Sequence, residues 1–453
     1  MEKAYNFDKS VSVLEEPQVA LELEIKTENK ESIQTKDLNV LSLFSGCGGM
    51  DLGFEGGFRV FKKSVNEIRH PDFIDRELNK DEVLLKKTRF KTVFANDILT
   101  DAKNAWINYF TKRGYKHSLF HDDSIVDLVK LHQSGSEIFP DKVDIVTGGF
   151  PCQDFSLSGK RNGFNSHKDH NGKLRSENAP SEETRGKLYM WMKQVIEITK
   201  PNVFIAENVK GLVNLENIKD LIQQDFSSAS DDGYFVFTPK VLHSADYGVP
   251  QSRERVIFIG VKKSALKEGV YEQLSNDKLS DFINPYPKPT HNYNGIEGAM
   301  LKDFVTVSDV LKRLDEPETS NDASQQWFSK AKYMGKHCQG QTEVKLGGIA
   351  PTIRSEHHGN IEFRRLSEEH GGKHVGELSK GLQERRLTPR ECALIQTFPS
   401  DYDFVIKSEI KKNKFIVSPS QAYKVIGNAV PPLLAYNIAK RIEELWEVYF
   451  KTE

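Results

Sequence analysis

Short apolar runs, each bounded by turn residues, recur along the chain from Leu38 onward. Five of them have the length of a β-strand and are rich in Val, Ile and Phe: residues 38–44, 92–97, 143–149, 202–208 and 255–261. Continuous apolar runs of this kind are typical of strands buried on both faces. Helical patterns lie between them, as at 101–110 and 186–200. Strands that alternate with helices predict an α/β fold with a doubly wound, mostly parallel sheet.

This alternation ends after Val261, which divides the predicted fold. Residues 38–261 form the expected first domain, and residues 262–384 are richer in Lys, Gly, Asn and His, with one clear helical pattern at 306–314. We therefore predict a second, smaller and irregular domain over 262–384. In the remaining segment, 385–453, apolar patterning returns at 385–398 and at 421–446, where we expect a turn followed by a long amphipathic helix. We predict that this helix packs back on the first domain.

Charge is unevenly distributed along the 453 residues, although the net charge is only −2. Residues 1–37 carry a net charge of −4 and little periodicity, and we interpret them as a polar acidic tail. Residues 325–390 carry a net charge of +5 and five of the 13 histidines. Because a phosphate backbone responds to local charge, this stretch is compatible with a nucleic-acid partner. A solvated surface is the alternative interpretation.

The four cysteines, Cys47, Cys152, Cys338 and Cys392, are widely spaced and form no CxxC pair. This spacing argues against a disulfide framework and against a structural zinc site, and we expect no bound metal. The chain has no run of about 18 apolar residues, which argues against a membrane span. Its acidic start lacks the apolar stretch of a secretory signal, so we expect a cytoplasmic protein.

A glycine-rich turn, FSGCGG at 44–49, directly follows the first predicted strand. Glycines allow a sharp turn and a close approach to a ligand, and this pattern differs from the dinucleotide motif GxGxxG. Asp97 ends the second strand, where an acid suits the hydroxyls of an adenosine ribose. A polar insertion, roughly 64–91, separates it from the turn, and Glu67 is the rival acid. Asp123, at the next strand tip, is the candidate to bind adenine.

Two potentially reactive side chains follow two other predicted strands. Cys152 lies just after the third strand, on a Gly-Gly-Phe-Pro turn, and Glu207 ends the fourth strand. A connection with one helix between these strands predicts that both strand tips meet at the same edge of the sheet, where ligands bind. A cysteine nucleophile beside a carboxyl group is the chemistry that this arrangement indicates.

Six motifs together resemble, in order, the signature blocks of the cytosine-C5 DNA methyltransferases of bacterial restriction–modification systems. They are FSGCGG (44–49), GGFPCQ (148–153), ENV (207–209), QSRER (251–255), RRLTPREC (385–392) and GNAVPP (427–432). The resemblance covers about 400 residues. It implies an S-adenosylmethionine-dependent methyltransferase fold, with a target-recognition domain in the variable region 262–384.

The resemblance also implies a mechanism. Cys152, as a thiolate, would add to C6 of a cytosine flipped out of duplex DNA, and Glu207 would hydrogen-bond the ring. Arg253 or Arg255 would supply positive potential near the thiol, with a structural ion pair as the alternative role. Residues 165–184 would form a loop that closes over the base, or else an inert insertion.

Further residues follow from matching the family's motifs one position at a time. The implied contacts with S-adenosylmethionine are Phe44, Gly46, Gly48, Gly49, Asp97, Asp123, Leu188 and Asn428, with Asp122 nearly as plausible as Asp123. The implied contacts with DNA are Gln251, Thr352, Ile353 and Arg354, because IAPTIRSEHHGN at 349–360 resembles the family's recognition loop.

The expected biological role is protection of DNA by a monomer, with a partner restriction endonuclease that acts on the same site without stable binding. Three alternatives stay open: a tRNA cytosine methyltransferase on the same scaffold, a catalytically silent DNA-binding regulator, and an unrelated nucleotide-binding oxidoreductase. The identity of the DNA target does not follow from the sequence.

Overall fold

A computed structural model of the chain describes residues 36–451 except 152–187, 215–217, 277, 294, 296–299, 336–340, 356–360 and 411–413. Cys152, Cys338 and the predicted loop 165–184 lie outside the described residues. By its internal contacts the chain divides into Met1–Asp37 and Leu38–Glu453. The expected tail 1–37 remains a prediction, and the fold described below belongs to the second unit.

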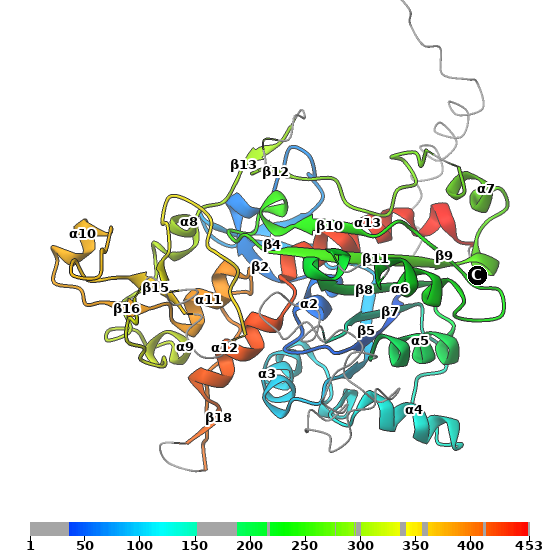
Figure 1. Cartoon of the computed structure of the whole chain (residues 1–453), viewed down its shortest axis with the longest axis horizontal. Helices are drawn as coiled ribbons and strands as arrows, with labels where there is room; N and C mark the ends of the chain where they lie inside the picture. The colour runs from blue at the N-terminus through cyan, green and yellow to red at the C-terminus, as the bar shows by residue number, and fades with distance from the viewer. Residues whose placement is uncertain are drawn as a thin grey trace, which may run out of the picture. The chain divides into compact units, whose positions relative to one another are not determined.

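The centre of this unit is an eight-stranded sheet with the order β10-β11-β8-β7-β1-β5-β6, in which β9 pairs with β11 (Figure 1). The parallel strands are β1 (Leu38–Leu43), β5 (Phe90–Asn96), β6 (Phe120–His121), β7 (Ile145–Gly149) and β8 (Val203–Val209). The antiparallel strands are β9 (Tyr234–Val236), β10 (Lys240–His243) and β11 (Glu254–Lys262). All five predicted strands are therefore present, in a mixed sheet whose larger part is parallel.

Helices cover both faces of the sheet because alternate strand residues point to opposite sides. On one face, residues such as Leu41, Val146 and Phe204 join a core with α4 (Ile125–Gln133), α5 (Leu188–Thr199) and α6 (Ile218–Ser227). On the other face, residues such as Val40, Ile145 and Ile205 join a core with α2 (Gly49–Glu55) and α13 (Pro432–Tyr449). The predicted doubly wound arrangement is confirmed.

Strand β11 differs from the parallel strands of the prediction, since it runs antiparallel to β8. The reason lies in the connection: β10 and β11 are joined by the short turn 244–253 and pair as a hairpin, which reverses the chain direction. As a result β11 starts, rather than ends, at the sheet edge where β8 ends, with Arg255 opposite Val209.

The predicted polar insertion after Phe58 forms a small sheet of its own. Strands β2 (Arg59–Phe61), β4 (Glu82–Leu85) and β3 (Ile74–Glu77) pair in that order and are antiparallel. Val83 and Leu85 are fully buried in a cluster that also holds Trp106 of α3 (Thr100–Phe110).

Short elements make up the region 262–384. They are α7 (Val270–Leu274), β12 (His291–Asn292), β13 (Lys302–Asp303), α8 (Val307–Leu311), α9 (Ala323–Gln326), β14 (Thr342–Glu343), β15 (Glu362–Arg365) and α10 (Val375–Leu378). Strand β15 pairs with β14 and with β16 (Arg385–Arg386). Val344 and Ile353 share a hydrophobic cluster with Val249 and Leu387. The expected boundaries of a separate domain, at 261 and 384, remain a prediction.

The C-terminal segment contains two helices where we predicted a turn and one long helix. After α11 (Pro389–Ile395) and the hairpin of β17 (Ile406–Lys407) and β18 (Phe415–Val417), α12 (Pro419–Asn428) begins at a capping box of Ser418 with Gln421. Pro431 and Pro432 end this run, since proline lacks the N–H group that a continued helix requires. Helix α13 then starts with Pro432 at a helix N-terminus, where proline is tolerated.

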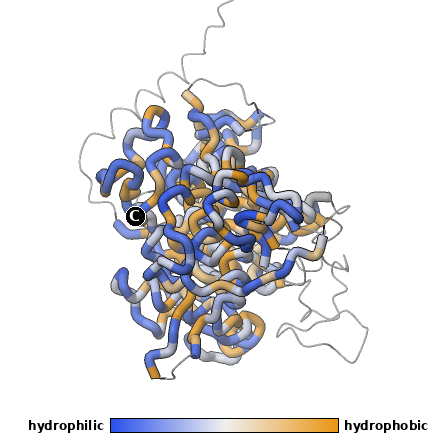
Figure 2. Tube along the Cα trace, turned by 90° about the vertical axis from the view of Figure 1, so that its left-hand side faces the viewer, coloured by the Kyte–Doolittle hydropathy of each residue, from blue (hydrophilic) through white to orange (hydrophobic). Residues whose placement is uncertain are grey.

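No helix in the part of the chain that the structure describes is long and apolar enough to cross a membrane. In Figure 2 the hydrophobic stretches are short and alternate with hydrophilic ones along the trace.

Candidate active site

The tips of β7 and β8 lie side by side at one edge of the sheet, as predicted. The two strands are parallel, and Gly149 pairs with Glu207. Beyond Gly149 the chain is fixed by the Asn208 side chain, whose Nδ2 donates to the carbonyl of Phe150 at 3.1 Å. Pro151 is the last described residue before Cys152. The strand that leads to Cys152 thus ends next to the carboxyl group of Glu207.

Glu207 is buried, with 8% of its surface exposed, and its Oε1 lies 2.6 Å from Nε of Arg255. Burial raises the pKa of the Glu207 carboxyl, and the positive charges of Arg255 and then Arg253 oppose this shift. Arg255 was expected to act on the Cys152 thiol or to form a structural ion pair. In the structure its partner is Glu207 itself, so it holds the carboxyl in place.

Arg253 is buried, with 1% of its surface exposed, and it donates two hydrogen bonds to main-chain carbonyls. Its NH1 donates to the carbonyl of Ile353 and its NH2 to that of Gly427, both at 3.0 Å. Arg253 therefore joins β11 to two segments that are more than 90 residues away in the sequence, and it acts on Glu207 through its charge.

The glycine-rich turn after β1 has an unusual backbone. Phe44, Gly46 and Gly48 all have positive φ, at 53°, 55° and 79°. A Cβ on Gly48 would lie 2.5 Å from the Phe110 ring, and one on Gly49 would lie 2.3 Å from the carbonyl of Val430. Gly46 has open space in that direction, with no atom within 4 Å. The turn is therefore packed on one side and accessible at Gly46, which fits a ligand that approaches the backbone closely.

Asp97 closes this turn from the neighbouring strand tip. Its Oδ2 accepts a hydrogen bond from the Gly46 N–H at 3.0 Å, and its Oδ1 accepts one from the Leu99 N–H at 2.9 Å. The rival acid, Glu67, lies in a turn outside any strand, where its charge acts on Lys62 and Lys302. Its position favours Asp97 as the acid of a ribose site.

The next strand tip presents Asp123. Asn96 fixes the backbone there, since its Nδ2 donates to the carbonyls of His121 and Asp123 at 2.9 and 2.8 Å. The Asp123 side chain is exposed. Asp122 instead forms an ion pair with Lys103 at 2.8 Å, and this hydrogen bond lowers its pKa. The structure thus favours Asp123 over Asp122 as the candidate to bind adenine.

The last two expected cofactor contacts lie at the ends of helices. Leu188 is buried at the start of α5 in a cluster with Leu43 and Phe150. Asn428 is exposed and is the last residue of α12. The break that follows α12 brings Val430 against Gly49, so Asn428 lies in the segment that contacts the glycine-rich turn.

Asp51, which the sequence reasoning missed, lies buried beneath the glycine-rich turn. Its carboxyl accepts hydrogen bonds from Ser42 Oγ at 2.5 Å and from Trp106 Nε1 at 2.7 Å. Burial raises the pKa of Asp51 to about 7. The available signal was an acid at the third position of the helix that follows the turn, in the sequence GMDLGFE.

Both described cysteines are buried. The Cys47 thiol donates to the carbonyl of Val425 at 3.4 Å, and burial raises its pKa. Cys392 lies in α11 with 3% of its surface exposed. Neither has the accessible, electropositive surroundings of a reactive thiol. Within the described ranges, no group of three His, Cys, Asp or Glu side chains is suited to hold a metal ion.

Comparison with known proteins decides the family. Residues 81–444 match the C-5 cytosine-specific DNA methylases, which is more than half of the chain. The chain belongs to this family.

Curated relatives of this methylase are similar over most of its length. The Type II methyltransferase M.BsuRI of Bacillus subtilis is 31% identical over 93% of this chain and 82% of its own. The Type II methyltransferase M.BspRI of Lysinibacillus sphaericus is 30% identical over 93% of this chain and 86% of its own. The methylase is accordingly a DNA (cytosine-5-)-methyltransferase.

A solved structure agrees on the fold. A prophage-encoded DNA modification methyltransferase of Escherichia coli superposes with a TM-score of 0.51 over 91% of this chain and 100% of its own, at 21% identity. At this identity the likeness concerns the α/β methyltransferase fold alone.

Two of the four residues expected to contact DNA are buried and two are half-buried. Gln251 has no exposed surface, and its Oε1 accepts a hydrogen bond from the Ile353 N–H at 2.9 Å. Thr352 donates its hydroxyl to the carbonyl of Ser252, and Ile353 is 2% exposed. Arg354 is half-buried. Gln251 and Ile353 are thus enclosed by other parts of the protein, whereas Arg354 keeps a partly accessible side chain. The contacts of all four residues with DNA remain a prediction.

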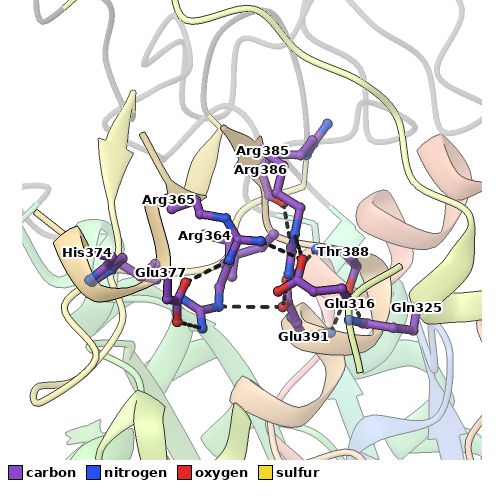
Figure 3. A network of polar contacts seen from close by, with 12 residues as sticks. Glu316, Gln325, Arg364, Arg365, His374, Glu377, Arg385, Arg386, Thr388 and Glu391 are labelled. Carbon is purple, nitrogen blue, oxygen red and sulfur yellow. Dashed lines mark hydrogen bonds and ion pairs between the residues drawn. The ribbon is translucent and has the colours of Figure 1, made fainter. Parts of the chain in front are cut away.

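In the basic stretch 325–390, arginines and lysines differ in their exposure. Five of its six arginines are buried: Arg364, Arg365, Arg385, Arg386 and Arg390. Three of them, Arg364, Arg365 and Arg385, form ion pairs with Glu316, Glu377 and Glu391 (Figure 3). The pair Arg385–Glu391 is bidentate, at 2.8 and 2.9 Å. The exposed positive charge is carried instead by lysines: Lys330, Lys332, Lys345, Lys373 and Lys380.

Proposed function

We propose that this methylase transfers a methyl group from S-adenosylmethionine to C5 of a cytosine flipped out of a specific duplex DNA sequence. Cys152 is the covalent nucleophile of this reaction, Glu207 activates the base and Arg255 orients Glu207. The observation that carries the proposal is the adjacency of two strand tips. Gly149 pairs with Glu207, so Cys152 follows three residues after the strand position that lies beside the carboxyl.

Covalent addition solves a chemical problem of the substrate. C5 of cytosine is a weak nucleophile, and addition of the Cys152 thiolate to C6 releases the C5–C6 electron pair toward C5. C5 then forms a bond to the methyl carbon of S-adenosylmethionine as the bond between that carbon and the sulfonium sulfur breaks. Loss of the C5 proton to a base and departure of the thiolate restore the double bond, so the enzyme ends unchanged.

Glu207 acts on the ring during this addition. A carboxyl whose pKa is raised by burial keeps its proton to higher pH, and a protonated carboxyl can donate to N3 of cytosine while it accepts from the exocyclic amine. Arg255 at 2.6 Å fixes the orientation of that carboxyl. The negative charge that develops on the ring is then stabilised by a group already in place.

The residues around the glycine-rich turn fit S-adenosylmethionine, which supplies an electrophilic methyl group when bound. Gly46 leaves the backbone open, and the Asp97 carboxyl is held next to it. Phe44, Gly48 and Gly49 belong to this turn. Asp123 would bind the adenine, and Leu188 and Asn428 would complete the cofactor contacts.

DNA binding by this methylase rests on Arg354 and on the exposed lysines of 325–390. Lysine is a compact point charge that suits phosphates, and arginine suits the two major-groove acceptors of guanine. Because the other five arginines of this stretch are buried, phosphate contacts fall to the lysines. Residues 262–384 are then the target-recognition domain. We further propose that the methylase acts as a monomer and protects DNA from a restriction endonuclease that acts on the same site.

The decisive experiment is transfer of a tritiated methyl group from S-adenosylmethionine to duplex DNA and, separately, to tRNA, followed by mapping of the modified base. Cys152→Ser abolishes product and leaves cofactor affinity within about threefold of the wild type. A duplex with 5-fluorocytosine at the target traps a covalent complex, because fluorine does not leave as the proton does. Near-normal methylation by Cys152→Ser contradicts the mechanism, and preference for tRNA contradicts the substrate.

A further inference from the structure

Two fully buried glutamines, Gln251 and Gln396, form a hydrogen-bonded pair between distant parts of the chain. Gln251 Nε2 donates to Gln396 Oε1 at 3.0 Å. The free ends of both amides are also used. Gln251 Oε1 accepts from the Ile353 N–H at 2.9 Å, and Gln396 Nε2 donates to the Ile426 carbonyl at 2.9 Å.

The orientation of the two amide groups is fixed by the main-chain groups at the two ends of this hydrogen-bonded chain. The Ile353 end is a main-chain N–H, which only donates, and the Ile426 end is a main-chain carbonyl, which only accepts. Each amide must therefore present its oxygen toward Ile353 and its nitrogen toward Ile426. No other assignment of the two amides satisfies all four groups.

Further contacts attach the same loop to the start of β11. The Ala350 N–H donates to the Pro250 carbonyl at 2.9 Å, and the Ser252 N–H donates to the Ala350 carbonyl at 2.8 Å. Arg253 then bonds the carbonyls of Ile353 and Gly427. The loop 349–355 is thus fastened by main-chain and side-chain contacts to the residues that directly precede Arg255.

The loop packs so closely against the end of α12 that a side chain at Gly427 would not fit between them. A Cβ on Gly427 would lie 2.2 Å from both the carbonyl carbon of Arg354 and the nitrogen of Ser355. The same segment touches the glycine-rich turn, through Val430 against Gly49. A shift of the loop would therefore displace Arg354 relative to Glu207 and the cofactor side.

We propose that Gln251 and Gln396 are positioning residues that hold the loop 349–355, and with it Arg354, at a fixed position relative to Glu207. They act on the reading of DNA, while cofactor binding and the chemical step depend on other groups. This inference rests on the proposed function, because it takes the loop to contact DNA.

The test uses the full chain with Gln251→Met, Gln396→Met and the double variant. Methionine keeps the length of the side chain and removes its hydrogen bonds. Gln325→Met is the matched control: Gln325 is also buried, donates to the Asp315 carbonyl and accepts from Thr388 Oγ1, and neither partner belongs to the loop. Thermal unfolding, the Kd of S-adenosylhomocysteine, KM for duplex DNA and kcat are measured for each, with the mapped target duplex and with one-base variants of it.

Both single variants raise KM for the target duplex at least tenfold and reduce discrimination against one-base variants to a similar extent. Their kcat and cofactor Kd stay within about threefold of the wild type. The double variant resembles either single variant, because residues that act as one unit are not additive. Gln325→Met lowers the unfolding temperature similarly but leaves KM and discrimination unchanged.

Equal KM and discrimination in the loop variants and in Gln325→Met overturn the inference, as does a loss confined to kcat. Wild-type protein that methylates tRNA in place of duplex DNA overturns the proposed function and the inference together. Wild-type DNA methylation with unaffected discrimination in the loop variants overturns the inference alone.

Discussion

Gly149 and Glu207 face each other across β7 and β8, and a Cβ on Gly149 would lie 2.9 Å from Glu207 Oε2. That distance is too short for a carbon and a carboxyl oxygen, so one of the two must move. Glu207 cannot move freely, because Arg255 holds its other oxygen at 2.6 Å. Glycine at position 149 is therefore required by the neighbouring strand's carboxyl.

Gly149→Ala should lower kcat at least tenfold, because the added methyl group displaces the Glu207 carboxyl from its proposed place beside the base. The unfolding temperature should change by only a few degrees, since the displaced atom is a side-chain end. Gly148→Ala is the control: its Cβ would meet Met192 Sδ at 3.0 Å, and a flexible methionine can adjust. Equal activity in the two variants, measured as methyl transfer to DNA, would contradict this role of Gly149.

The pH profile of kcat/KM should report the ionisation of Glu207. Glu207→Gln should lower kcat/KM by about 10²-fold or more and remove one limb of the profile. Arg255 lowers the pKa of Glu207, so its removal raises that pKa further. The limb that disappears in Glu207→Gln should therefore move to higher pH in Arg255→Met.

Arg255→Lys separates charge from geometry, because lysine keeps the positive charge without the planar guanidinium. It should shift the same limb less than Arg255→Met does. A limb that stays in place, or moves to lower pH, in Arg255→Met would show that Arg255 does not control the Glu207 carboxyl.

Asp51 should make folding stability depend on pH. Its pKa is raised from 3.8 to about 7 by burial, so the folded state prefers the protonated form. The associated stability is fully present below pH 4 and is lost as pH rises toward about 7, by on the order of 2–4 kcal/mol. Urea unfolding from pH 4 to pH 8 measures this loss.

Asp51→Asn should remove the Asp51 part of this pH dependence. An amide oxygen can still accept from Trp106 Nε1, and the amide nitrogen can donate to Ser42 Oγ. Glu55, four residues further along α2, is also buried with a raised pKa, so part of the slope remains in the variant. Identical slopes in wild type and variant would indicate that Asp51 is not protonated at neutral pH in the folded state.

In the stretch 325–390, mutation of a buried arginine should lower folding stability, whereas mutation of an exposed lysine should weaken DNA binding. Arg365 is 1% exposed and pairs with Glu316 at 2.5 Å and with Glu377 at 2.7 Å (Figure 3). Arg365→Met removes one of the two arginine partners of each carboxylate, because Glu316 keeps Arg385 and Glu377 keeps Arg364. It should lower the free energy of unfolding by about 1–3 kcal/mol. Chemical denaturation measures this change.

Lys373 is exposed, so Lys373→Ala should change the free energy of unfolding by less than about 0.5 kcal/mol. It should instead weaken binding to all duplex sequences and reduce the slope of log K against log salt by about 1. A loss of stability in Lys373→Ala, or an unchanged salt slope, would contradict phosphate contact by this lysine.

The methyltransferase sheet was predictable from the sequence because its strands are buried on both faces and so appear as continuous apolar runs. The same is true of the meeting of Gly149 and Glu207, since a connection with one helix leads to a parallel neighbour. The direction of β11 was not predictable, because an apolar run does not tell whether the strand before it is a hairpin partner.

The sequence by itself predicted which groups carry the chemistry, because Cys152 and Glu207 stand in motifs whose residue types and order are specific. Only the tertiary structure decided what the charged and polar residues near them do. Arg365 and Lys373 look alike as positive charges in a basic stretch, and Gln251 looks like a polar residue fit for DNA. Burial separates them, because a buried charge needs a partner charge and a buried amide needs its hydrogen bonds, whereas an exposed lysine can bind a ligand.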